Sequence, residues 1–261
     1  MTADRQYEER IRGEFTRQAD AMTASPRFTD ERRLTDLRAV AALDASMRVL
    51  DLGCGPGIVS EPLAQDVGQL VGLDLTPEML KRAAKRCTDA GRENAAFVLG
   101  NSKRLPFADA SFDVVVTRSA IHHFDDPTTV LAEVARILRA GGRLVLSDVV
   151  SSEDADESSL HNALETLRDP SHVRMLSRSV LLGELKRAGF EVESEAQQVA
   201  HREFGEWLAI TNDSSRIGPL QVVMRELAEA GSHAGVNLRY EDGRILFDHT
   251  TLVIRAVKTT T

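Results

Sequence analysis

The spacing of hydrophobic residues divides the chain into helical and strand-like stretches. Residues 5–43 carry apolar side chains at helical spacing, and the run is broken near Ser25 and Pro26, which predicts two N-terminal helices. From Met47 onward, short apolar runs alternate with helical stretches. The runs that predict strands are 48–52, 70–75, 96–99, 113–117 and 143–149, with two more at 190–199 and 252–257. Apolar strands separated by helices are typical of a parallel sheet, so the pattern predicts an α/β fold.

Residues that start and stop helices mark the helical stretches between these strands. Pro77 begins one apolar stripe and Gly91 follows it, while Asp126 and Pro127 precede a second stripe that ends before Gly141. An acidic, Ser-rich stretch and a further helical pattern follow the fifth strand, which predicts an insertion over the sheet. The later helices are predicted at 180–188, around Trp207 and at 222–230.

Composition and charge exclude several classes of protein. The chain has 261 residues with 40 acidic and 32 basic side chains, a formal net charge of −8. This balance argues against wholesale nucleic-acid binding, which needs Lys and Arg to neutralise phosphates. No apolar run approaches the ~20 residues of a membrane helix, and the charged N-terminal stretch lacks the apolar segment of an export signal. Cys54 and Cys87 form no CxxC pair, so we expect no disulfide framework and a reducing, cytoplasmic setting.

The most informative segment is a glycine-rich turn after the first predicted strand. It reads VLDLGCGPGI over residues 49–58, and its glycines allow a sharp turn and a close approach of the backbone to a ligand. A dinucleotide-binding fingerprint needs a glycine where Ile58 stands, whereas Asp51 ahead of the first glycine matches the pattern DxGxGxG. Ligands of open parallel sheets bind at this carboxyl edge, so the turn predicts a nucleotide-type ligand there.

A carboxylate ends the second predicted strand, twenty-three residues after Asp51. Asp74 can accept hydrogen bonds from both hydroxyls of a ribose, which would let the protein recognise a nucleoside. The alternative is that Asp74 only caps the helix that begins at Pro77. The pairing of Asp74 with the glycine-rich turn favours the ribose.

Four segments in order carry a resemblance to a known family: VLDLGCGPG from residue 49, GLDLTPEML from 72, LGNSKRLPFADASFDVVVTRSAIHHF from 99 and LAEVARILRAGGRLVLSDV from 131. Over this region the chain resembles the class I S-adenosylmethionine (SAM)-dependent methyltransferases, within them the small-molecule group that includes the ubiquinone and menaquinone methyltransferases. The resemblance implies a Rossmann-like α/β fold: a doubly wound, mostly parallel seven-stranded sheet with a helical N-terminal lid and an insertion after the fifth strand. SAM is the implied cofactor.

The resemblance also implies which residues contact SAM. The glycine-rich turn with Asp51 would hold the methionyl part, and Asp74 the ribose. Leu75 and Met79 would flank the adenine. In the family the loop after the third strand often reads Gly-Asp, whose acid accepts from the adenine amino group; Asn101 here still offers a carbonyl acceptor. The predicted cofactor-binding residues are Asp51, Gly53, Gly55, Gly57, Asp74, Leu75, Met79, Asn101, Ser102 and Arg118.

The chemistry of methyl transfer decides which side chains could be catalytic. Displacement at a sulfonium has a leaving group that is already activated, so the protein mainly supplies alignment and excludes water. A nucleophile that must lose a proton needs a base, for which His122 and His123 are the candidates, with His123 preferred. The alternative is that these histidines only line the pocket. We expect no metal there, because adjacent side chains on an irregular loop chelate poorly.

Substrate contacts are expected from the lid and from the region after the fifth strand. The predicted substrate-binding residues are Phe15, Arg168, His172, Arg174 and Trp207. Pro170 favours a turn that would fold the two arginines over the cleft, where their planar forks suit a carboxylate-bearing substrate. The alternative is that they pair with local carboxylates such as Glu165. Arg118 likewise either binds a carboxylate or pairs with local acids.

The leading hypothesis is SAM-dependent methyl transfer to O, N or C of a small-molecule metabolite. Two alternatives stay open: a protein that uses SAM without methyl transfer, by cyclisation or elimination, and a non-catalytic SAM-binding protein. The expected organisation is a lid over 1–43 and a SAM-binding domain over 44–261, in which 151–178 and 203–245 form substrate caps. The expected partner is a small-molecule substrate, without nucleic acid or membrane, and a homodimer stays open.

Overall fold

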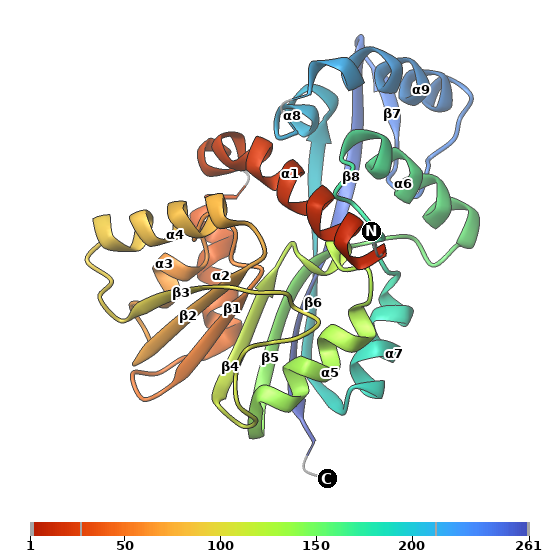
Figure 1. The fold of residues 1–261 in the computed structure, drawn as a ribbon. Coiled ribbons are helices and arrows are strands. Elements are labelled where there is room, and N and C mark those ends of the chain that lie inside the picture. The colour runs from red at the N-terminus through yellow and green to blue at the C-terminus, as the bar shows by residue number, and fades with distance from the viewer. Residues whose placement is uncertain (1–2, 27, 212, 260–261) are drawn as a thin grey trace.

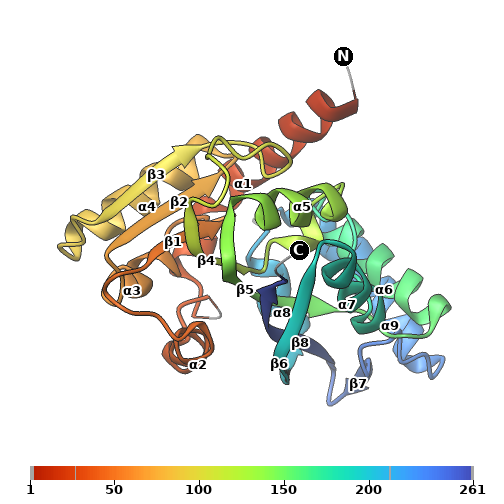
Figure 2. The ribbon, with the colours of Figure 1, turned by 90° about the horizontal axis from the view of Figure 1, so that it is seen from below.

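The computed structural model describes residues 3–26, 28–211 and 213–259, which form a twisted sheet with helices on both faces (Figures 1 and 2). The strands are β1 (Arg48–Leu52), β2 (Gln69–Asp74), β3 (Ala95–Leu99), β4 (Phe112–Arg118), β5 (Leu138–Val150), β6 (Phe190–Glu203), β7 (Arg239–Glu241) and β8 (Arg244–Lys258). Their order is β3-β2-β1-β4-β5-β8-β6, with β7 paired to β8. Neighbours from β3 to β5 are parallel, and β8 is antiparallel to its partners. The predicted mostly parallel α/β sheet is confirmed.

The sheet has one strand more than the seven predicted, counted over the described residues. β7 pairs with the start of β8 across Asp242 and Gly243, which both have positive φ. Its three residues are too short to show an alternating pattern. β6 and β8 are also longer than predicted and run past the carboxyl edge of the sheet, toward α8 and β7 (Figure 1).

The helices agree with the punctuation in the sequence. They are α1 (Ala3–Ala24), α2 (Glu31–Ala41), α3 (Ser60–Leu63), α4 (Pro77–Asp89), α5 (Pro127–Ile137), α6 (Ala155–Arg168), α7 (Arg178–Arg187), α8 (Phe204–Ala209) and α9 (Ile217–Glu229). The carboxylate of Asp126 accepts from Thr129 N at the start of α5, so the predicted cap is confirmed. The end of α5 differs from the prediction: α5 ends at Ile137, and Gly141, the predicted stop, lies within β5, which begins at Leu138 and not at residue 143. In the described part of the chain, no helix has both the length and the apolar character needed to cross a membrane.

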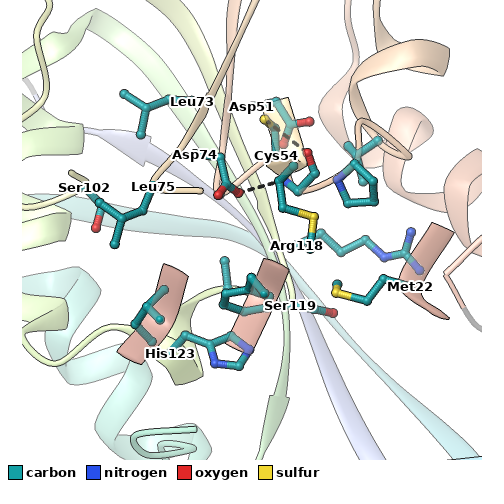
Figure 3. A pocket seen from close by; sticks show the side chains of 18 of the residues that line it. Met22, Asp51, Cys54, Leu73, Asp74, Leu75, Ser102, Arg118, Ser119 and His123 are labelled. Atoms are coloured by element: carbon teal, nitrogen blue, oxygen red, sulfur yellow. Dashed lines mark hydrogen bonds between the residues drawn. The ribbon is translucent and has the colours of Figure 1, made fainter. Parts of the chain in front are cut away.

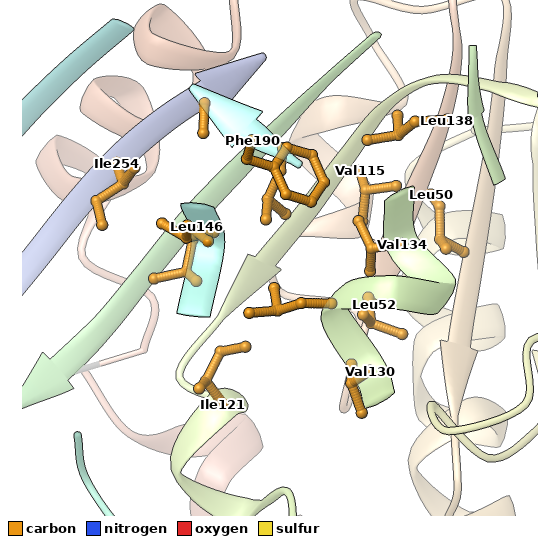
Figure 4. Close-up of a cluster of buried hydrophobic side chains, with 14 of the residues drawn as sticks. Leu50, Leu52, Val115, Ile121, Val130, Val134, Leu138, Leu146, Phe190 and Ile254 are labelled. Carbon is orange, nitrogen blue, oxygen red and sulfur yellow. The ribbon is translucent and has the colours of Figure 1, made fainter. Parts of the chain in front are cut away.

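Residue alternation in β1 shows how the sheet is covered on both faces. Val49 packs in one cluster with α2 and α3, while Leu50 and Leu52 pack in another with α5 and α7 (Figure 4). Successive side chains of a strand point to opposite faces, so an uninterrupted apolar strand requires helices on both. This arrangement is the doubly wound one that the resemblance implies.

A third cluster lies beyond the carboxyl edge of the sheet, where α6, α8, α9 and β7 gather (Figure 1). We call it the cap cluster; its buried members are Leu164, Phe204, Trp207, Leu208, Leu220, Met224, Ala234, Val236, Leu238, Ile245 and Phe247. α1 crosses the same edge of the sheet and contacts α4. The edge that parallel sheets use for ligands is therefore covered by α1 and flanked by the cap cluster.

The close approach of the glycine-rich turn to α4 leads to a stability prediction. Gly57 has φ of +78°, and a Cβ on it would lie 2.7 Å from Cα of Ala83. We expect Gly57→Ala to lower the free energy of unfolding by about 3 kcal/mol, since left-handed strain and overpacking both contribute. Gly91→Ala is the matched control, because Gly91 has φ of +69° with open space around it. Equal losses in chemical denaturation would contradict this account of the contact.

Candidate active site

A pocket lies at the carboxyl edge of the sheet beneath α1 (Figure 3). It holds about 950 Å³ of non-protein space, including its open mouth, which is the size of a small-molecule site. We call it the edge pocket; its lining is Tyr7, Ile11, Phe15, Met22, Phe28, Asp51, Gly53, Cys54, Gly55, Pro56, Ile58, Val59, Leu73, Asp74, Leu75, Met79, Gly100, Asn101, Ser102, Arg118, Ser119, Ala120, His123 and Phe124. The loops after β1, β2, β3 and β4 therefore meet around one cavity.

The glycine-rich turn is tied to the end of β2. Gly53 N and Cys54 N both donate to Leu73 O, at 2.8 and 3.0 Å. Gly55 N donates to Asp74 Oδ2 at 2.9 Å (Figure 3). A Cβ on Gly55 would meet nothing within 4 Å, so the turn presents bare backbone to the open space of the pocket.

Asp74 faces the edge pocket while it also organises the chain around it. Besides Gly55 N, its carboxylate accepts from Thr76 N at 2.8 Å, directly ahead of α4. One backbone bond on each oxygen leaves acceptor capacity on both. Burial raises the pKa of Asp74, against the opposing effect of these hydrogen bonds. The Asp74 side chain therefore both lines the pocket and supports the start of α4.

Asp51 lies deeper, beneath the turn. It is 1% exposed, and its Oδ2 accepts from Ser60 Oγ at 2.5 Å. Burial raises the pKa of Asp51 to about 7, although the bond from Ser60 lowers it.

The loop after β2 forms an apolar wall of the edge pocket, and the loop after β3 forms a polar wall. Leu75 and the buried Met79 line the first, and Asn101 and Ser102 line the second. Asn101 Oδ1 accepts from the backbone of residue 103 at 2.8 Å. Its Nδ2 donates to Glu8 Oε1 at 2.8 Å, so this amide also holds α1 over the pocket.

Arg118 lines the pocket at the end of β4. Its Nη1 donates to Phe28 O at 3.0 Å. Burial lowers the pKa of Arg118 to about 10, and the carboxylates of Asp30 and Asp51 act in the opposite direction. The guanidinium is therefore a charged group at neutral pH, close to both a carboxylate and the pocket.

His123 lies in a short 3-10 turn after β4 and reaches the edge pocket (Figure 3). Its ring meets Phe15 edge-on with centroids 4.8 Å apart, and its carbonyl accepts from Tyr7 Oη at 2.7 Å. His123 Nδ1 lies 3.0 Å from Ser171 O and 3.3 Å from Ser171 Oγ, whose own proton goes to Asp169 Oδ1 at 2.6 Å. A carbonyl only accepts, so we assign the proton to Nδ1 and the lone pair to Nε2. Burial, together with the charge of His122, lowers the pKa of His123 to about 4. At neutral pH it is an uncharged acceptor.

His122 has the opposite character. Its Nδ1 lies 2.5 Å from Asp148 Oδ1, while Asp148 Oδ2 accepts from Ile121 N at 2.7 Å. Burial opposes the charged form of His122, but the Asp148 carboxylate outweighs it and raises the pKa; His122 in turn lowers the pKa of Asp148. The sequence interpretation did not single out Asp148, although it lies near the carboxyl end of β5, two residues before its last residue Val150.

Of the predicted substrate residues, the structure brings Phe15 into the edge pocket but not the others, which are Arg168, His172, Arg174 and Trp207. Arg168 Nε donates to Glu165 Oε2 at 2.9 Å and its Nη1 donates to Trp207 O at 3.2 Å. His172 Nε2 lies 2.8 Å from Asn162 Oδ1, and Arg174 is exposed. The pairing of Arg168 with a local carboxylate is the alternative that the sequence left open.

The turn near Pro170 does reach the site, through Ser171 and through two backbone amides. Ser171 O is the partner of His123 Nδ1, and the amides of Val173 and Arg174 donate to His122 O. Among the lining residues that the sequence interpretation did not single out are Met22, Ser119 and Phe124. The signal for Met22 was present, because it continues the face of α1 that carries Tyr7, Ile11 and Phe15.

Comparisons with known proteins agree with this site. Residues 50–146 match the family model described as a methyltransferase domain. The uncharacterized methyltransferase YcgJ of Bacillus subtilis is 34% identical over 201 residues, covering 77% of this chain and 76% of YcgJ. The 27-O-demethylrifamycin SV methyltransferase of Amycolatopsis mediterranei is 34% identical over 168 residues, 62% of this chain and 61% of that protein.

Solved structures give the same result for the fold. The crystal structure of YcgJ superposes with a TM-score of 0.79 at 28% identity, covering 88% of this chain and 100% of YcgJ. BH2331 of Bacillus halodurans superposes with a TM-score of 0.80 at 30% identity, covering 87% and 99%. With the glycine-rich turn and Asp74 placed in one pocket, these matches show that the chain belongs to the class I SAM-dependent methyltransferases.

Proposed function

We propose that this SAM-dependent methyltransferase methylates an O, N or C atom of a small, largely apolar metabolite, held between α1 and His123. The observation that carries the proposal is that one cavity joins the glycine-rich turn and Asp74 to an apolar wall and to an uncharged histidine. Ile11, Phe15 and Phe124 contribute to that wall. The relative named as a 27-O-demethylrifamycin SV methyltransferase supports a small-molecule acceptor.

The lining of the edge pocket fits SAM. The bare backbone at Gly55 leaves room for a ligand to approach, and Asp74 keeps free acceptor capacity. We assign Asp74 to the ribose, the glycine-rich turn with Asp51 to the methionyl part, and Leu75 with Met79 to the adenine. Asn101, Ser102 and Arg118 complete the proposed cofactor contacts. SAM, when bound, supplies a methyl group on a positively charged sulfur.

The chain's own contribution is alignment and exclusion of water. α1 is held over the pocket by the bonds from Tyr7 to His123 O and from Arg12 to Leu75 O. Covering the site in this way keeps water from the reacting atoms and holds them in line. His123 Nε2 would take the proton of an O–H or N–H acceptor, since Ser171 O fixes the tautomer that leaves this nitrogen free.

The remaining proposals concern the substrate cap, the partners and the cellular setting of the protein. Segments 151–178 and 203–245 lie beside the covered edge and would limit which substrates enter, with 1–43 as the lid. A net charge of −8 disfavours nucleic acid as a partner. The buried free thiols of Cys54 and Cys87 support a reducing, cytoplasmic setting. Association as a homodimer is open to measurement by analytical ultracentrifugation.

The reaction itself can be tested with methyl-labelled SAM and a metabolite extract. We expect label in a low-molecular-weight product together with S-adenosylhomocysteine. Methylthioadenosine without a labelled product would favour elimination chemistry, and tight SAM binding without either product would favour a non-catalytic protein. Each of the last two outcomes would overturn methyl transfer to a small molecule.

The role of Asp74 can be tested by calorimetry. Asp74→Asn keeps one acceptor oxygen for the backbone but loses the charge, and hydrogen bonds to charged groups are worth about 1.5 to 3 kcal/mol each. We expect SAM affinity to fall by about tenfold to a hundredfold. Asp89→Asn, at an exposed position of α4, is the control and should bind as the parent does. Unchanged affinity in Asp74→Asn would refute the ribose assignment.

The role of His123 can be tested through rates and pH. We expect His123→Gln to lower kcat by about 100-fold, with SAM affinity nearly unchanged. His123 stays neutral above its pKa of about 4, so the ratio of parent to variant rates should be flat from about pH 6 to pH 8. The ratio should fall as the pH drops toward 4, when His123 becomes protonated.

Taking the ratio of the two rates removes the pH effects of other titrating groups, including Asp51, because both enzymes contain these groups. His201→Gln, which changes an exposed histidine, is the matched control and should behave as the parent. A parent-to-variant ratio that rises through pH 6.5 would show that His123 titrates at its ordinary value, against the arrangement described here.

A further inference from the structure

A second group of buried polar side chains lies between α6 and β8, outside the lining of the edge pocket. His161 and Glu165 are one helical turn apart on α6, and His249 faces them from β8. The three are 3%, 4% and 2% exposed. One ligand atom from each lies within 4.8 Å of the others. We call these residues the α6–β8 cluster.

The distances within the cluster are near those between ligands of one metal ion, and somewhat longer for His161. His249 Nε2 lies 3.1 Å and His161 Nε2 4.0 Å from Glu165 Oε1. The two imidazole rings are 5.5 Å apart between centroids. Ligands about 2.1 Å from a tetrahedral ion lie about 3.4 Å from one another, so small side-chain shifts would bring these three atoms onto one centre.

His161 is the observation that points to a ligand. Neither of its ring nitrogens has a hydrogen-bond partner among the described residues, although the side chain is buried. A buried polar group without a partner destabilises the folded protein, and native structures rarely contain one. A metal ion would take the lone pair of a neutral imidazole and remove this cost.

The outer partners of Glu165 have the form found around metal ligands. Trp207 Nε1 donates to its Oε1 at 3.1 Å, and Arg168 Nε donates to its Oε2 at 2.9 Å. Such outer hydrogen bonds orient a ligating carboxylate. A purely ionic network of Glu165, Arg168 and His249 would explain these bonds without an ion, but it gives neither ring nitrogen of His161 a hydrogen-bond partner.

We propose that His161, Glu165 and His249 bind a divalent transition-metal ion, with Zn²⁺ the best match to two imidazoles and one carboxylate. Three protein ligands leave the fourth position to a solvent molecule. The ion would fasten the insertion after β5 to the last strand. It would lie one helical turn before Asp169, in the segment whose Ser171 carbonyl holds His123. The site is separate from the pair His122 and His123, for which no metal was expected.

The proposal can be tested on tag-free, full-length protein from cells grown with added Zn²⁺. After gel filtration we expect about one Zn²⁺ per chain by elemental mass spectrometry. His161→Ala and His249→Ala should each weaken Zn²⁺ binding by about 100-fold or more, beyond the effect of losing an outer partner. His201→Ala removes an exposed histidine and should leave the zinc content unchanged.

Stability measurements separate a bound ion from a surface contaminant. Adding Zn²⁺ to chelator-stripped protein, at 100 times the dissociation constant, should raise Tm by about 5 to 10 °C. Circular dichroism and gel filtration establish whether each variant is folded. If the alanine variants do not fold, His161→Gln and the visible spectrum of the Co²⁺-loaded parent replace them, and a four-coordinate cobalt spectrum that His161→Gln loses is the expected result.

Three results would overturn the proposal, and none depends on methyltransferase activity. The first is a parent protein without zinc whose Tm does not respond to Zn²⁺. The second is zinc retained with equal affinity in folded His161 and His249 variants. The third is a Co²⁺ spectrum that His161→Gln leaves unchanged.

Discussion

The edge pocket depends on how the glycine-rich turn is tied to the end of β2. Leu73 O accepts hydrogen bonds from two backbone amides of the turn, and the Asp74 carboxylate accepts a hydrogen bond from a third. These bonds join the first two βα connections, so the backbone that approaches a ligand and the carboxylate that can recognise it are positioned by the same contact. Without a side chain at Gly55, that backbone stays accessible from the pocket. The regular spacing of parallel strands would not by itself provide this alignment.

His122 and His123 are adjacent in the chain, but their hydrogen-bond partners shift their pKa values in opposite directions. His122 has the Asp148 carboxylate as its partner, which favours its charged form. His123 has a backbone carbonyl of Ser171 as its partner, and the charge on His122 disfavours a second proton next to it. A proton on His122, which Asp148 favours, therefore helps to keep His123 neutral, and the neutral form of His123 is the one that can accept a proton.

Local signals predicted most of the fold and the meeting of the glycine-rich turn with Asp74 at one edge of the sheet. Apolar runs, helix stops and the glycine-rich turn depend on neighbours in the chain, and most of them appear in the structure; the stop predicted at Gly141 does not, because Gly141 lies within β5. The choice for Arg168 between a substrate and local Glu165 could not be made in this way, because it depends on Trp207, which contacts Arg168 from 39 positions away. The contact of Ser171 with His123 likewise joins residues 48 positions apart. β7 was missed because three residues carry too little pattern.

The cap explains why the segment near Pro170 reaches the site through Ser171 and not through the side chain of Arg168. Arg168 stacks on Trp207 with its charge paired to Glu165, so its side chain belongs to the interior of the cap and not to the edge pocket. Fixing Arg168 also fixes where the following turn can go. The turn then brings Ser171 O to His123, and this bond decides which ring nitrogen carries the proton. Packing in the cap is in this way connected to the protonation state of a group at the pocket.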